Sequence, residues 1–81
     1  MSYLNQEVSV TSFYFRNSRV FPRQIEMEGE SLSFLETGLR CLVQRGQEFI
    51  QIFNMSDGHK LYPLSFEPGN RTWKLLSSRS L

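Results

Sequence analysis

The residues of this chain that could do chemistry are few, and they are not grouped for catalysis. The only cysteine, Cys41, and the only histidine, His59, lie far apart in the sequence, whereas a metal site needs several such ligands to converge. Ser56, Asp57 and His59 are close in sequence, but a catalytic triad is a spatial arrangement around an oriented histidine. We therefore expect no catalytic residues, no metal and no cofactor, a polar turn at 56–59, and a buried thiol at Cys41.

A second group combines arginine with aromatic side chains. It contains Arg16, Arg19 and Arg23, close in sequence to Tyr14 and Phe21. Small β-barrels bind single-stranded nucleic acid by stacking bases on aromatic rings beside a positive groove. Here nine basic residues are nearly balanced by eight acidic ones, so the domain has no strong long-range field to attract nucleic acid. Nucleic-acid binding through these five residues is therefore the alternative hypothesis.

Apolar residues outside the expected core are a stronger indication of function. After one face of each expected strand is assigned to the core, a second apolar set remains, which includes Leu35, Leu42, Ile50 and Ile52. Large apolar patches on soluble domains usually mark contact surfaces. We therefore expect a non-catalytic module that binds a protein partner or a second copy of itself through these four residues. If the strand faces are assigned wrongly, or if a helix covers one face of the sheet, these apolar residues are buried within the domain and need no partner.

The elements that must position these residues are short and regularly punctuated. Runs rich in Phe, Tyr, Val and Ile alternate along almost the whole chain with Gly, Pro, Asn, Asp and Ser, a spacing typical of small all-β domains. We expect one domain over 1–81, an antiparallel meander or barrel of about six or seven short strands. Its termini, 1–7 and 77–81, are expected to fray.

The segment 32–43 has two interpretations. Its apolar residues recur mostly at steps of three and four, which is helical spacing and would give an α+β fold. Gly38 inside such a helix would cost about 1 kcal/mol relative to alanine. Two strands separated at Thr37-Gly38 are therefore expected, and the helix is kept as the alternative.

Turn residues and aromatic residues complete the expected fold. Glycine tolerates the positive φ that tight turns require, and proline presets its own φ. Hairpin turns are expected at Asn17-Ser18, Asp57-Gly58 and Pro68-Gly69, with positive φ at the two glycines. The large aromatic residues expected in the core are Phe13, Phe53, Phe66 and Trp73.

Composition and the first residues indicate the compartment. A single cysteine allows no internal disulfide and suits a reducing environment. The stretch from Met1 to Val8 lacks the charged and then apolar pattern of a secretory signal. No apolar run approaches the roughly 20 residues that a membrane-spanning helix needs. We therefore expect a cytoplasmic protein with no membrane partner.

Overall fold

The computed structural model describes residues 2–16 and 19–80, except for the side chains at 2–4, 14, 16 and 36–39. Within these residues the chain forms seven strands and no helix, which confirms the expected all-β class. The strands are β1 (Ser2–Arg16), β2 (Arg19–Met27), β3 (Glu30–Ser33), β4 (Glu36–Arg45), β5 (Glu48–Ser56), β6 (Lys60–Glu67) and β7 (Thr72–Ser80). The segment 32–43 is strand, so its helical spacing does not reflect a helix.

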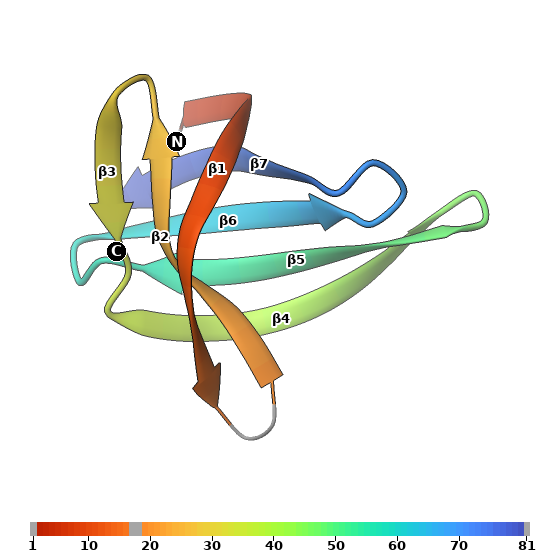
Figure 1. Cartoon of the computed structure of the whole chain (residues 1–81), viewed down its shortest axis with the longest axis horizontal. Helices are drawn as coiled ribbons and strands as arrows, with labels where there is room; N and C mark the ends of the chain where they lie inside the picture. The colour runs from red at the N-terminus through yellow and green to blue at the C-terminus, as the bar shows by residue number, and fades with distance from the viewer. Residues whose placement is uncertain (1, 17–18, 81) are drawn as a thin grey trace.

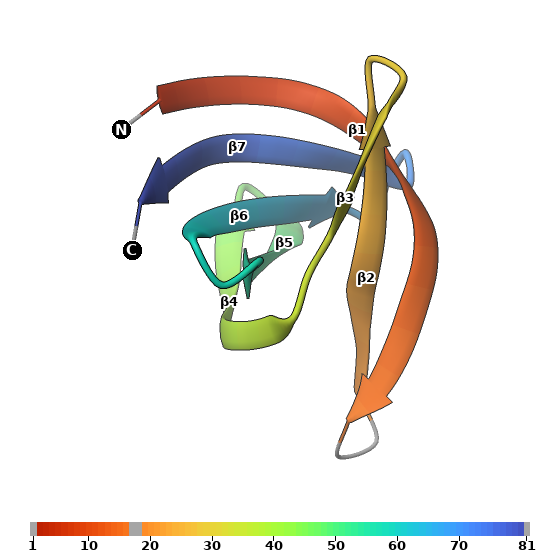
Figure 2. The ribbon, with the colours of Figure 1, turned by 90° about the vertical axis from the view of Figure 1, so that its left-hand side faces the viewer.

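The strands form one antiparallel sheet in the order β3-β2-β1-β7-β6-β5-β4, a meander that is not closed into a barrel. β1 is long and strongly bent, because its first half pairs with β7 as far as Val8 and its second half pairs with β2 from Ser9. The bend folds the sheet into two layers. In Figure 1 the second half of β1 with β2 and β3 crosses in front of β4–β7, and Figure 2 shows the two layers from the side.

A corner at Phe34 and Leu35 links the two edge strands, β3 and β4. The Phe34 N–H donates to the Arg23 carbonyl oxygen at 2.8 Å, and the Leu35 N–H donates to the Ser56 carbonyl oxygen at 2.8 Å. The first bond attaches the corner to β2 and the second attaches it to β5. The chain therefore changes layer here and not at Thr37-Gly38, which lies inside β4 where its register with β5 shifts.

The core lies between the two layers and draws residues from both. Phe21 of β2 packs edge-on against Phe53 of β5, with ring centroids 6.0 Å apart. Ile25, Met55 and Leu64 are completely buried. The buried apolar residues of this cluster are Val8, Phe21, Ile25, Phe34, Phe53, Met55, Tyr62, Leu64 and Leu75.

The structure corrects part of the expected core. Phe53 is buried as expected, but Phe66 and Trp73 are only half-buried and Phe13 is 47% exposed. Phe66 and Trp73 belong to β6 and β7, whose hairpin extends beyond the front layer in Figure 1, and Phe13 belongs to β1. Phe66 and Trp73 pack against the edge of the core cluster, and Phe13 covers Trp73 from the front layer, so these three rings lie at the margin of the core rather than inside it.

Near both termini of the described chain the backbone is paired, since Ser2 lies opposite Ser78 in the β1–β7 ladder, and fraying at 1–7 and 77–81 stays a prediction. The turns differ in part from expectation. Gly58 has the expected positive φ of 94°, whereas in the Pro68-Gly69 turn the positive φ falls on Arg71, at 55°. The expected turn at Asn17-Ser18 lies outside the described residues.

Candidate functional site

The four residues expected in a partner contact do not form one surface. Ile50 and Ile52 lie on the outer face of the β4–β7 layer, away from the core, and Ile50 is only 7% exposed. Leu42 lies on the inner face, the one that carries the core, and is 59% exposed. Leu35 lies at the corner before β4 and is 74% exposed. What these residues share is that each lies on β4, next to it on β5, or just before it.

β4 itself is largely exposed, since all its side chains from Cys41 to Arg45 are exposed. It is an edge strand, paired with β5 only, and this pairing is regular from Arg40 to Arg45. Its other edge leaves backbone N–H and C=O groups without a strand partner in the described residues. Proteins usually protect such edges with proline, lysine, bulges or a covering segment. The register shift in β4 lies before Arg40, so the regular part of the edge has no bulge.

Exposed apolar side chains flank this edge on both faces. Successive side chains of a strand point to opposite faces, so Cys41 and Val43 point outward and Leu42 points inward. Cys41 is exposed and Val43 is 43% exposed. The expectation of a buried thiol is therefore wrong, because no further strand covers β4. We call the backbone edge Arg40–Arg45 with these three side chains the β4 edge surface.

On the inner face, the β4 edge surface continues into an aromatic row. Leu42 lies opposite Gln51, Gln51 opposite Phe66, and Phe66 opposite Trp73, one residue from each of β4 to β7. The rings of Phe66 and Trp73 are 4.8 Å apart, and Phe13 of β1 stands 6.2 Å from Trp73. Phe66, Trp73 and Phe13 thus form an aromatic group on the inner face, and the half-buried Gln51 lies between this group and Leu42.

On the outer face, the same edge borders a cavity of about 320 Å³. Ile50, Ile52 and Leu76 contribute apolar side chains to it, and Val43 lines it from β4. The buried Ser65 also lines this cavity. Ile50 and Ile52, which the sequence placed in a contact, therefore lie just inside the edge rather than on an open surface.

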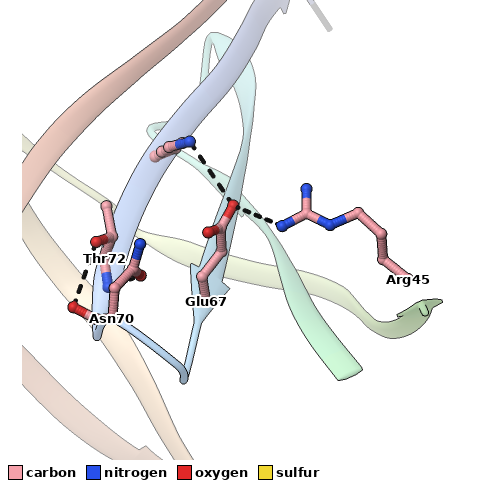
Figure 3. A network of polar contacts seen from close by, with 5 residues as sticks. Arg45, Glu67, Asn70 and Thr72 are labelled. Atoms are coloured by element: carbon pink, nitrogen blue, oxygen red, sulfur yellow. Dashed lines mark hydrogen bonds and ion pairs between the residues drawn. The ribbon is translucent and has the colours of Figure 1, made fainter. Parts of the chain in front are cut away.

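A charged group lies beside this cavity. Glu67 Oε1 is 3.3 Å from a guanidinium nitrogen of Arg45 and 3.7 Å from Nζ of Lys74 (Figure 3). The neighbouring turn is ordered by Asn70, whose Oδ1 accepts the Thr72 N–H at 3.2 Å. The two ion pairs connect Arg45, at the end of β4, with Glu67 of β6 and Lys74 of β7.

Ser56, Asp57 and His59 build a turn, as expected. Asp57 Oδ1 accepts the backbone N–H groups of His59 and Lys60, both at 2.8 Å, and Asp57 Oδ2 accepts the Tyr62 hydroxyl at 3.0 Å. The two backbone hydrogen bonds lower the pKa of Asp57 below 3.8. Burial raises the pKa of Tyr62 above 10.0. The carboxylate thus serves the hairpin, and it accepts no hydrogen bond from the His59 side chain.

The alternative nucleic-acid site is only partly assembled. Arg19 and Arg23 are exposed, but Phe21 is buried, with its ring against Phe53. Phe21 therefore offers no face to a base, which corrects its expected role. The side chains of Tyr14 and Arg16 lie outside the described part of the chain.

The described residues contain neither a group of metal ligands nor a membrane-spanning helix, and the chain matches no known protein. In the described residues, no three His, Cys, Asp or Glu side chains are grouped so as to hold a metal ion. The same residues include no helix with the length and apolar character to cross a bilayer. No protein-family model, curated protein or solved structure matches the chain.

Proposed function

We propose that this chain is a non-catalytic protein-interaction module that associates through the β4 edge surface. The observation that carries the proposal is an unpaired, regular sheet edge with exposed apolar side chains on both of its faces. An extended segment added to such an edge gains main-chain hydrogen bonds and buries apolar side chains at the same time. Both gains are available along Arg40–Arg45.

The neighbouring surfaces support this proposal. On the inner face Leu42 is followed by Gln51 and then by the aromatic row, and on the outer face Val43 lines the cavity together with Ile50, Ile52 and Leu76. An added strand would therefore find apolar surface on either side of its backbone. Interfaces generally combine such an apolar centre with a polar rim, and Arg45 and Glu48 lie at the end of the edge.

The test is the mass of the protein in solution over a range of concentrations, measured by sedimentation equilibrium. The wild type is expected to associate as its concentration rises, and Leu42→Glu to remain a folded monomer, because a charge would be placed in the apolar centre of the contact. We expect the substitution to weaken association by at least about tenfold, since burying an unpaired charge in an interface costs several kcal/mol.

Leu35→Glu is the matched control for this substitution. Leu35 is more exposed than Leu42 but lies at the corner outside the β4 edge surface, so its substitution should leave association unchanged. A wild type that stays monomeric to millimolar concentration would restrict the proposal to a different protein as partner, and association that Leu42→Glu leaves unchanged would overturn it. Binding of single-stranded oligonucleotides, with an affinity that falls steeply as the salt concentration rises, would overturn the proposal and favour the nucleic-acid hypothesis.

The proposal includes a cytoplasmic location. The single cysteine supports it, because an exposed thiol such as Cys41 stays reduced in that compartment. Cell fractionation with the tagged full chain tests this point, and recovery in a membrane or extracellular fraction would contradict it.

A further inference from the structure

The regular part of β4 has a pattern that indicates which protein it binds. We infer that the partner is a second copy of this chain, and that the two β4 strands pair antiparallel about a two-fold axis at Leu42. The two sheets would then form one continuous sheet. This inference rests on the proposed function and adds the identity of the partner and the register of the pairing.

Two-fold symmetry restricts the registers that are possible. In a symmetric antiparallel pair, a residue and its counterpart exchange roles in the two copies, and residues directly opposite each other lie on the same face. With the axis at Leu42, this residue faces itself. Cys41 then faces Val43 of the second copy on the outer face, and Arg40 faces Gln44 on the inner face.

This register agrees best with the residues of β4. All five positions from Arg40 to Gln44 fall in the stretch that pairs regularly with β5. Every apolar residue among them faces an apolar residue, and no two like charges stand opposite each other. Opposite charges or apolar pairs across strands are favourable, whereas directly opposed like charges are not.

The neighbouring registers are less favourable. An axis at Cys41 would need Val43 to pair with residue 39, which lies in the stretch where the β4–β5 register shifts. An axis at Val43 would place Cys41 opposite Arg45 and Arg40 opposite Gly46 in the turn. The axis at Cys41 extends the pairing into an irregular stretch of backbone, and the axis at Val43 loses the apolar contact of Cys41. The axis at Leu42 avoids both.

The surroundings of β4 extend the contact beyond the strand. Cys41 and Val43 lie opposite Ile52 and Ile50 on β5, so pairing would join the outer apolar strips of the two copies. On the inner face the Arg40 guanidinium stands over the Phe53 ring, 5.9 Å from its centre. That position directs the charge toward its own core, away from the second copy's Arg40.

Cysteine crosslinking of the full chain tests the register. Residues directly opposite in an antiparallel pair have Cα atoms about 4.5–5.5 Å apart, which is within the range of a disulfide. Under mild oxidation, Val43→Cys, which retains the native Cys41, should form a covalent dimer. Leu42→Cys combined with Cys41→Ser should also form one. The wild type, whose Cys41 residues are diagonal to each other, should give less than about a tenth of that yield.

Gln47→Cys combined with Cys41→Ser is the control for chance collisions, because Gln47 is exposed in the β4–β5 turn outside the paired stretch. It should crosslink no more than the wild type. Circular dichroism of each reduced variant confirms the fold before oxidation.

The outcomes separate the two proposals. Efficient crosslinking of the wild type would overturn the Leu42 register in favour of an axis at Cys41. A dimer in sedimentation without crosslinking of either Val43→Cys or Leu42→Cys combined with Cys41→Ser would overturn the β4–β4 pairing, while association itself would stand. A monomer at all concentrations would overturn the pairing of two copies, while binding of a different protein through the β4 edge surface would stand.

Discussion

At the scale of single residues, Asp57 shows how a polar side chain can be engaged in folding rather than chemistry. Its carboxylate accepts two backbone N–H groups and the Tyr62 hydroxyl, so the charged form is favoured in the folded state and the pKa of Asp57 is lowered. The stabilisation it contributes is therefore present above pH 3.8. It is lost as the pH falls through the lower pKa of the folded state.

We predict that Asp57→Asn removes this part of the acid sensitivity. At neutral pH the variant should be less stable than the wild type, because an amide accepts these hydrogen bonds less strongly than a carboxylate. Below pH 3.8 the two proteins should converge in their free energy of unfolding. Urea denaturation across acidic pH measures both, and parallel pH profiles would contradict the prediction.

At the scale of elements, the turns show two different reasons for glycine. Gly58 adopts a φ of 94°, which side chains with a Cβ rarely adopt. Gly69 has no such φ, but a Cβ there would stand 2.9 Å from Glu48 Oε1. That oxygen is the far end of a flexible, exposed side chain and can move aside.

We therefore predict a contrast between two alanine substitutions. Gly58→Ala should lower the free energy of unfolding by about 1–2 kcal/mol, because alanine is strained at positive φ. Gly69→Ala should change it by less than about 0.5 kcal/mol, as for ordinary surface positions. Chemical denaturation of both variants tests this prediction. Equal changes in the free energy of unfolding would contradict the contrast between a strained φ at Gly58 and a neighbour that can move aside at Gly69.

At the scale of the whole molecule, Trp73 connects the two layers at the margin of the core. Its ring lies 6.2 Å from Phe13 of the front layer, and 5.4 Å and 4.8 Å from Phe53 and Phe66 of the back layer. Aromatic pairs at such separations stabilise beyond the area that they bury. Trp73 therefore contributes to the packing of both layers although it is only half-buried.

We predict that Trp73→Ala lowers the free energy of unfolding by about 3 kcal/mol, at the lower end for large aromatic truncations. This is a large fraction of the stability of so small a domain. Phe15→Ala is the control, since Phe15 is exposed and its loss should change stability by less than about 0.5 kcal/mol. Similar melting temperatures for Trp73→Ala and the wild type would contradict this role.

The sequence by itself determined the all-β class, the approximate number of strands and some of the turns between them. Alternation of side chains and turn residues act over a few neighbouring positions, so they are readable without a fold. Gly58 illustrates this, since its place after Asp57 sufficed to predict a positive φ. The two strands within 32–43 were predicted for the same reason, although their boundary proved to be Phe34-Leu35.

Which apolar residues are covered was decided only by the tertiary structure. Phe13 and Phe21 both occur in apolar strand runs, yet Phe13 is exposed and Phe21 is buried. The difference lies in what each ring contacts, since Phe21 packs against the buried Phe53, whereas Phe13 packs against Trp73, which is itself only half-buried. Likewise, Cys41 is exposed because β4 is an edge strand, and strand order depends on pairing between distant segments. Local patterns carry no information about that pairing, so the β4 edge surface emerges only from the folded sheet.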